Sequence, residues 1–195
     1  MYGCNKLYCE HLGRYYAHSY RQLAKDSVAG KDKNRGVVDF RCVRYPGLIS
    51  ADTIPTGGTS DFVPEMLHAA ARGEQYKCFV RPDSRIPFMT MPEAIEATLK
   101  LADTERKDLT QIVYNIASFN PSAGEVADLV KVHFPNADIT FEPDERRQAI
   151  VDSWPSALDC SVAQRDWGFK PTYTLEQAFE QYLVPRITKQ HESSV

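Results

Sequence analysis

The chain has 195 residues, of which 43% are hydrophobic and 25% are charged, and its formal net charge is −3. This is the composition of an ordinary globular protein with one hydrophobic core and room for a small attached lobe. The weak negative charge gives no reason to expect binding to nucleic acid or to an anionic membrane.

The cysteine spacing and the hydropathy argue against a disulfide-rich, a zinc-binding or a membrane-spanning protein. There are five cysteines, with no CxxC pair and no zinc-type spacing, so we expect free thiols and no metal site. No apolar run reaches about 18 residues, and the N-terminus has no signal or transit peptide. These features predict a soluble intracellular protein, cytoplasmic unless a longer eukaryotic form carries a mitochondrial transit peptide.

The N-terminal segment, from Tyr2 to about Arg21, has the apolar spacing of a helix. Tyr2 and Lys6 are four residues apart and therefore share one helix face. An ammonium group at that distance favours the phenolate and so suits a tyrosine that acts as a base, although a plain helix surface has the same pattern. Further along, Tyr15, Tyr16 and Tyr20 form an aromatic stripe, which is typical of core packing or of a helix–helix interface.

The next segments alternate between loop and regular structure. A polar loop is expected from Ala24 to Gly36, and a buried strand from Val37 to Tyr45. Pro46 and Gly47 end that strand. In an α/β protein this end points at the ligand crevice, where a glycine lets a cofactor approach the backbone, although a plain turn also explains the pair.

A glycine-containing loop from Thr53 to Asp61 precedes a helix with helical spacing of apolar residues. Thr59 or Ser60 is predicted to cap this helix. Hydroxyl groups at a helix N-terminus also suit a carboxylate or phosphate ligand, so both roles stay open.

The remaining chain alternates strand and helix patterns, which predicts an α/β fold. The helix at 92–102 is expected to turn Ile95, Leu99 and Ala102 inward. His133, near the end of the next helix, is expected to be a surface group that complements the helix dipole. The segment from Pro143 to Pro155 reads as a dense polar loop. The predicted strands are 76–80, 86–89, 112–117 and 139–141, and the predicted helices are 92–102, 120–133, 161–167 and 175–183.

Several of these patterns together resemble a known enzyme family. Residues 2–6 (YGCNK) look like the YxxxK signature of the short-chain dehydrogenase/reductase superfamily. Residues 41–50 (RCVRYPGLIS), 56–62 (TGGTSDF), 114–119 (YNIASF), 147–155 (RQAIVDSWP) and 166–170 (DWGFK) are more specific. They resemble the L-threonine 3-dehydrogenases of the extended, UDP-galactose-epimerase-like type, over nearly the whole chain.

The resemblance implies an NAD-dependent oxidation of L-threonine to 2-amino-3-oxobutyrate. It makes Tyr2 the general base, and Lys6 the residue that holds the nicotinamide ribose and lowers the tyrosine pKa. Pro46, Gly47, Leu48 and Ile49 would lie beside the nicotinamide. The substrate would contact Thr59, Ser60, Asp61 and Trp154. The family loop usually reads GGGTTD, whereas this chain has TGGTSD at 56–61.

The largest departure from the family concerns the cofactor phosphates. No GxGxxG or GxxGxxG occurs in the sequence. We therefore expect the C-terminal part of an extended short-chain dehydrogenase Rossmann-like fold, with a small α/β substrate-binding lobe and without the N-terminal nucleotide-binding half. The chain would form a single region over 1–195, with an exposed insertion at 24–35, and would be inactive by itself.

Two other functions remain open at this stage. One is a nucleotide-sugar epimerase or dehydratase of the same superfamily. The other is a truncated, non-catalytic product that acts only as a dimerisation module through the helix with the Tyr–Lys pair. The complete enzyme is expected to be a homodimer.

Overall fold

The computed structural model describes residues 1–20 and 38–192, so the predicted insertion at 24–35 lies outside the described residues. The strands are β1 (Cys42–Arg44), β2 (Gly47–Ile49), β3 (Tyr76–Cys78), β4 (Phe88–Thr90), β5 (Val113–Asn115) and β6 (Ile139–Phe141). The helices are α1 (Tyr2–His18), α2 (Phe62–Arg72), α3 (Met91–Asp103), α4 (Ala123–His133), α5 (Glu145–Asp152), α6 (Ser161–Trp167), α7 (Leu175–Ala178) and α8 (Val184–Glu192). A 3₁₀ turn, η1 (Arg106–Asp108), follows α3, and a π-helical turn, η2 (Phe179–Leu183), joins α7 to α8.

The strands form three short parallel pairs: β1 with β5, β2 with β4, and β3 with β6. Helices connect the strands and cover them, which confirms the predicted α/β class. Parallel pairs need such crossovers, because their connections must return to the same end of the sheet.

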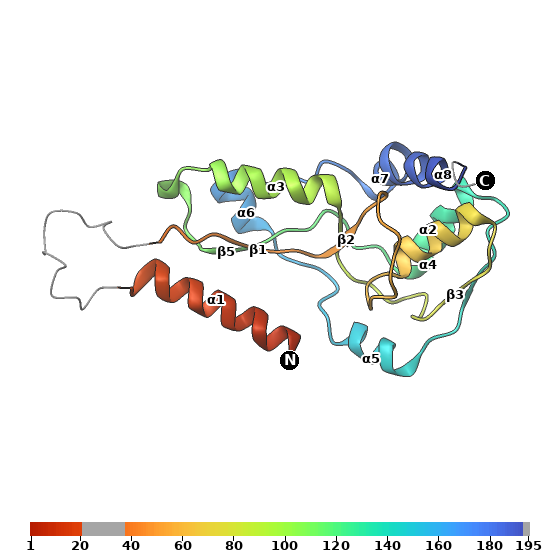
Figure 1. Ribbon diagram of the computed structural model, residues 1–195, viewed down its shortest axis with the longest axis horizontal. Coiled ribbons are helices and arrows are strands. Elements are labelled where there is room, and N and C mark those ends of the chain that lie inside the picture. The colour runs from red at the N-terminus through yellow and green to blue at the C-terminus, as the bar shows by residue number, and fades with distance from the viewer. Residues whose placement is uncertain (21–37, 193–195) are drawn as a thin grey trace, which may run out of the picture.

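Two hydrophobic clusters divide the molecule. One lies among α2, α4 and the C-terminal helices and includes Phe62, Phe88 and Phe179. The other lies between α3 and α6 and includes Tyr114 and Trp167. Figure 1 shows α3 and α6 at one end of the body and α2, α4, α7 and α8 at the other, with the β2–β4 pair between them.

Capping residues fix where several helices begin. Thr90, Ser122 and Thr174 each start a helix with a capping box, in which the third helical residue bonds back to the cap. The side chain of Glu93 is also bonded at its other oxygen by the hydroxyl of Ser118 and by two backbone amides, of Thr172 and Tyr173. This buried carboxylate therefore ties the start of α3 to the segment before α7.

Helix α1 is attached to the body along β1. Glu10 forms an ion pair with Arg44 at 2.7 Å, and the backbone amide of Val38 donates to the carbonyl of Tyr16. Gly13 packs on Phe40 so closely that an added Cβ would lie 2.2 Å from its ring. In Figure 1, β1 and β5 run between α1 and α3.

Several predicted boundaries differ from the structure. The strand predicted from Val37 to Tyr45 is formed only at Cys42–Arg44 and is half-buried or exposed. After Pro46 the chain enters a second strand, β2, instead of a loop. Neither Thr59 nor Ser60 caps α2, because its N-cap is Asp61, which makes no capping hydrogen bond through its side chain.

The buried face of α3 was predicted wrongly. Ile95 and Leu99 are 54% and 60% exposed, and Ala102 is exposed. The face that packs on the sheet carries Ala94, Ala97 and Leu101. His133 also differs from its prediction, because its ring lies against Phe179 and its Nε2 is buried.

Two helices were not predicted. The 143–155 segment contains α5, and the chain continues beyond Leu183 as α8. All five cysteines are free thiols, as predicted. Among the described residues, no helix has the length and apolar character needed to span a bilayer.

Candidate functional site

Helix α5 contacts the loop of the candidate substrate site and is itself held by polar contacts. Its N-cap, Asp144, accepts a hydrogen bond from the backbone amide of Arg147. Gln148 is buried and accepts from the backbone amide of Arg81 at 2.7 Å, while its amide donates to the hydroxyl of Ser84. The ion pair of Arg81 with Asp152 then fixes the far end of α5.

The electrostatics at this end follow from those contacts. The guanidinium of Arg81 and then the amide of Gln148 hold the pKa of Asp152 below its ordinary value. Asp152 therefore keeps its charge and its bonds to both partners to a lower pH than an isolated aspartate would. These polar contacts hold α5 together with the packing of Val151 in the hydrophobic core.

The loop at 56–61 is a tight turn closed by Asp61. The carboxylate of Asp61 accepts from the backbone amide of Gly58 at 2.7 Å, and its own amide donates to the Gly58 carbonyl. Gly57 has φ of +88°, a conformation that favours glycine. Asp61 was predicted to contact substrate, and in the structure one of its oxygens is engaged within the loop.

The hydroxyl groups of Thr59 and Ser60 lie on the same turn and are half-buried. Within the described part of the chain, neither hydroxyl makes a hydrogen bond to another protein group. The two predicted substrate residues therefore have their donors and acceptors available for a ligand.

Trp154 follows α5 directly, and its backbone amide donates to the carbonyl of Val151. Trp154 is 38% exposed, so part of its side chain is accessible to a ligand. Arg147 lies on α5 itself. Its Nη2 donates to the carbonyls of Gly57 and Gly58, at 3.3 and 2.8 Å. Helix α5 therefore contacts the loop at 56–61 through Arg147, and Trp154 follows the same helix in the chain.

The predicted catalytic pair lies at the beginning of α1. The ammonium of Lys6 is 5.2 Å from the ring centroid of Tyr2, so the two side chains share one helix face as predicted. Tyr2 is 77% exposed, and every residue from 1 to 9 is exposed. The phenol and the ammonium are therefore accessible to a cofactor or a partner surface.

The segment 46–49 connects the two core clusters. Ile49 is fully buried and Leu48 is half-buried against the second cluster. An added Cβ at Gly47 would lie 2.6 Å from the ring of Phe88. Close packing on Phe88 therefore explains the glycine without a cofactor.

The structure does not bring all the predicted site residues into direct contact. Within residues 1–20 and 38–192, no hydrogen bond or ion pair links Tyr2 or Lys6 to the 46–49 segment, to the 56–61 loop or to Trp154. Nor does any group of three or more metal-ligating side chains occur in that part of the chain. Of the predicted substrate residues, the 56–61 loop is bonded to α5 through Arg147 and Trp154 follows α5, while the predicted catalytic pair lies on α1.

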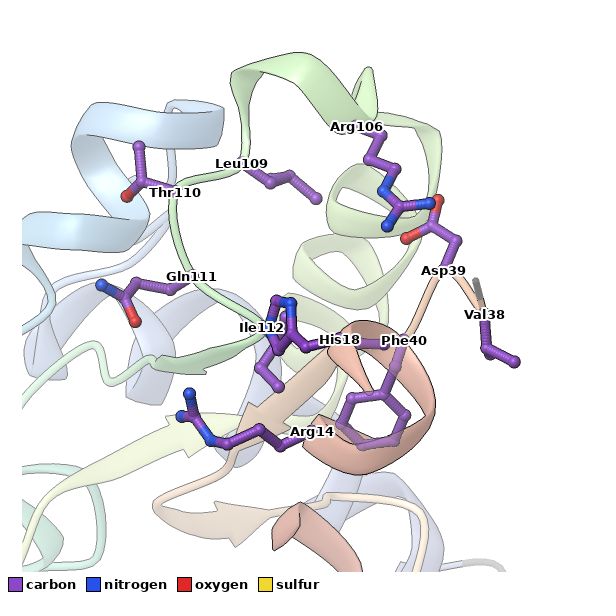
Figure 2. Close-up of a pocket in the computed structure, with 11 residues that line it drawn as sticks. Arg14, His18, Val38, Asp39, Phe40, Arg106, Leu109, Thr110, Gln111 and Ile112 are labelled. Carbon is purple, nitrogen blue, oxygen red and sulfur yellow. The ribbon is translucent and has the colours of Figure 1, made fainter. Parts of the chain in front are cut away.

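One cavity of about 150 Å³ lies elsewhere, between the end of α1 and the amino ends of β1 and β5 (Figure 2). Arg14, His18 and Arg106 line it together with Asp39, whose carboxylate is paired with Arg41. None of the predicted site residues lines this cavity. It is therefore a feature separate from the candidate site.

Sequence reasoning missed Arg147 and Gln148 as residues that shape the site. The signal was weak, because both belong to a charged segment with no apolar periodicity. A buried glutamine and a half-buried arginine acquire their roles only from backbone groups that are distant in the sequence.

Comparisons with known proteins bear on this arrangement. No protein-family model matches the chain. The mitochondrial L-threonine 3-dehydrogenase of Bos taurus is 36% identical over 177 residues, which is 91% of this chain and 43% of the relative. A protein from Staphylococcus haemolyticus named uncharacterized epimerase/dehydratase is 34% identical, over 90% of this chain and 50% of its own length.

The solved structures agree. The L-threonine 3-dehydrogenase of Trypanosoma brucei matches 98% of this chain and 54% of its own, with a TM-score of 0.83 and 32% identity. The chain is homologous to the C-terminal part of L-threonine 3-dehydrogenases. It spans about half the length of the relatives it matches. A UDP-glucose 4-epimerase from Thermotoga maritima, with 17% identity and a TM-score of 0.59, shares the fold.

These matches confirm the predicted resemblance to L-threonine 3-dehydrogenases with a Rossmann-like fold of the extended short-chain type. Proteins named as epimerase/dehydratase also occur among the relatives, which is the class that the alternative prediction gave for this chain. In the matched structures the corresponding part is the C-terminal one.

Proposed function

We propose that this chain carries the substrate side of an NAD-dependent L-threonine 3-dehydrogenase. The observation that supports this most is the structural match to the Trypanosoma brucei enzyme, which extends over 98% of the chain and so includes both α1 and α5. On this proposal the loop with Thr59, Ser60 and Asp61, together with Trp154, receives the amino acid.

Tyr2 is proposed as the general base. Its phenolate removes the proton from the β-hydroxyl of L-threonine. Lys6, whose ammonium lies 5.2 Å from the centroid of the Tyr2 ring, is proposed to offer N–H donors to the ribose diol. The hydride would leave the β-carbon that bears this hydroxyl group, and NAD would supply its acceptor when bound.

The residues present fit only one end of that cofactor. Exposed Lys6 and Tyr2 suit the nicotinamide ribose, and the segment Pro46, Gly47, Leu48 and Ile49 is proposed to lie beside the nicotinamide. The glycine-rich turn that seats a pyrophosphate does not occur in these 195 residues. We therefore expect no tight NAD binding and no threonine-dependent NADH formation by this chain alone.

Binding of the amino acid is the part of the proposal that this chain can test. L-Threonine is titrated while indole fluorescence is recorded, because Trp154 is exposed and the other tryptophan, Trp167, is 5% exposed. The expected result is a saturable change that disappears in Trp154→Phe. UDP is titrated in parallel, and binding of UDP without binding of L-threonine would transfer the chain to the nucleotide-sugar class.

A second role, pairing of two copies through α1, is supported by a specific surface. Large apolar side chains are exposed along this helix, namely Tyr2, Leu7, Tyr8, Leu12, Tyr15 and Tyr16. The rings of Tyr15, Tyr16 and Tyr20 pack on each other, and Tyr15 and Tyr16 stay 49% and 38% exposed. Sedimentation tests this role: a concentration-dependent dimer supports it, and a monomer at all concentrations contradicts it.

A mitochondrial location is proposed from the names of two relatives. The relatives from Bos taurus and Sus scrofa are named as mitochondrial. A longer form of this chain with a transit peptide would enter the same organelle, and imaging of the natural protein tests this.

A further inference from the structure

A column of aromatic rings runs from the core toward the 56–61 loop. The rings of Phe88 and Phe62 meet edge to face, with centroids 5.5 Å apart, and Phe62 meets Phe79 in the same way at 6.3 Å. The guanidinium carbon of Arg147 lies 3.1 Å from the centroid of Phe79. Three buried rings therefore end in a stacked cation.

The backbone beneath Arg147 is attached to the same segment as Phe79. The amide of Asp144 donates to the carbonyl of Phe79 at 2.9 Å, and the amide of Arg147 donates to the carboxylate of Asp144 at 2.9 Å. Gln148 then accepts from the amide of Arg81. Both the base and the head of the arginine side chain are thus fixed relative to the core.

The other side of the guanidinium meets the loop. Its Nη2 donates to the carbonyls of Gly57 and Gly58. Hydrogen bonds from a charged donor are stronger than neutral ones, and these two lie at the point where the backbone turns through positive φ. No other side chain in the described residues bonds a backbone group of this loop from outside it.

Arginine is suited to this place in a way that lysine is not. A planar guanidinium stacks on a ring with its face and donates hydrogen bonds from its edge, whereas an ammonium is a compact point charge. The same side chain therefore joins an aromatic column to two carbonyl groups at once.

We propose that Arg147 is a positioning residue that holds the 56–61 loop in place before substrate binds. This rests on the proposed function only in taking the loop as the place where the amino acid binds. The arginine touches no reacting atom, and it acts by fixing the turn that carries Thr59 and Ser60.

The test compares Arg147→Gln and Arg147→Lys with Arg146→Gln, in the full 195-residue chain. Arg146 is the adjacent residue on α5 and is exposed. Its substitution removes the same charge but leaves the contacts of Arg147 with Phe79, Gly57 and Gly58 in place. Two measurements are made on each variant: amide hydrogen exchange of residues 57–61, and the L-threonine titration followed through Trp154.

In Arg147→Gln we expect loop exchange to be faster by about tenfold and L-threonine affinity to be lower by about tenfold, the order expected for a lost charge-assisted hydrogen bond. Arg147→Lys should lie between, because it keeps a charged donor and loses the stacking. Arg146→Gln should match the unsubstituted chain. The denaturation midpoint of all three variants checks that the fold is retained.

Each outcome decides a different point. Equal loop exchange in Arg147→Gln and Arg146→Gln overturns the proposal. Faster exchange with unchanged L-threonine affinity also overturns it, because the contacts of Arg147 would then stabilise the loop without affecting substrate binding. If the unsubstituted chain does not bind L-threonine, the proposed function fails, while the exchange data still decide whether Arg147 holds the loop.

Discussion

Helix α1 and the α5 region carry the two halves of the proposed chemistry, and they are held in opposite ways. On α1 the residues from 1 to 9 are all exposed, and the ion pair of Glu10 with Arg44 marks where contact with the body begins. In the α5 region, a buried glutamine, a stacked arginine and an ion pair fix one short helix and one loop to the core.

The difference shows what each site requires from the fold. A loop that recognises a small amino acid must be ordered by contacts within the same unit, because disorder reduces affinity. A Tyr–Lys pair on an exposed helix keeps its spacing from the helix geometry alone. The loop proposed to bind substrate is therefore held by contacts within this chain, whereas the residues around the proposed catalytic pair are exposed.

The largest expected effect lies in the core beneath the loop. Phe62 is fully buried between Phe79 and Phe88. Phe62→Ala should lower the free energy of unfolding by about 3–5 kcal/mol, because it removes a buried ring and leaves a cavity. Urea denaturation measures this change. Ile95→Ala, at a 54% exposed position, is the control and should change stability by less than about 0.5 kcal/mol.

A second substitution acts on α1 instead. Gly13→Ala places a Cβ 2.2 Å from the ring of Phe40 and should weaken the docking of α1 by about 1–3 kcal/mol. An undocked helix of this length is marginal in water, so helical circular dichroism should fall. The matched control is Gly3→Ala, where a Cβ meets nothing within 4 Å. If both variants lose the same helical signal, contact with Phe40 does not hold α1.

A pH titration tests the C-terminal side of the body. Burial, then the charge of His191 and that of Arg72, lowers the pKa of His68 to about 4 from 6.5. The unfolded chain takes up this proton first, so stability is complete above the unfolded pKa and declines as the pH falls from 6.5 toward 4. Near pH 5 the loss should be about 2 kcal/mol.

The contacts of His68 define the control for that titration. Its Nδ1 lies 2.9 Å from Nε2 of His191, so α8 is joined to α2 at this point. His68→Gln should remove most of the decline in stability between pH 6.5 and 5, measured by urea denaturation at each pH. An unchanged decline would assign it to other groups.

The smallest effect is expected at the surface of α1. Glu10→Gln breaks the ion pair with Arg44, whose side chain is 52% exposed. Exposed pairs contribute little, so the loss should be less than about 1 kcal/mol and should shrink further in high salt. A larger loss of stability that does not depend on salt would contradict this. It would mean that the ion pair with Arg44, and not packing on Phe40, is the main contact that holds α1.

Much of the α/β pattern was predictable from sequence because apolar periodicity reports buried faces. The predicted buried face of α3 was wrong by one position along the helix. The buried Ala94 and Ala97 give a weak apolar signal, whereas the exposed Ile95 and Leu99 give a strong one. Helix α5 was not predicted because one of its two buried residues is Gln148, whose partners are the backbone of Arg81 and the hydroxyl of Ser84. No periodicity encodes such distant polar contacts.

The candidate site divides in the same way. The spacing of Tyr2 and Lys6 follows from a local rule, and the structure places the two side chains on one face as predicted. The roles predicted for Pro46–Ile49, Thr59–Asp61 and Trp154 stay predictions. Arg147 was not found, because its function depends on where the chain brings Gly57 and Gly58 after folding.

Amide hydrogen exchange on the unsubstituted chain tests the contrast between α1 and the α5 region most directly. We predict rapid exchange in residues 2–9 of α1, which are all exposed, and slow exchange in α5 and in the amides of Gly58 and Asp61, which are bonded within the loop. Slow exchange at the start of α1 together with rapid exchange in the 56–61 loop would contradict it. The catalytic helix would then be the ordered element, and the substrate loop would require a ligand to form.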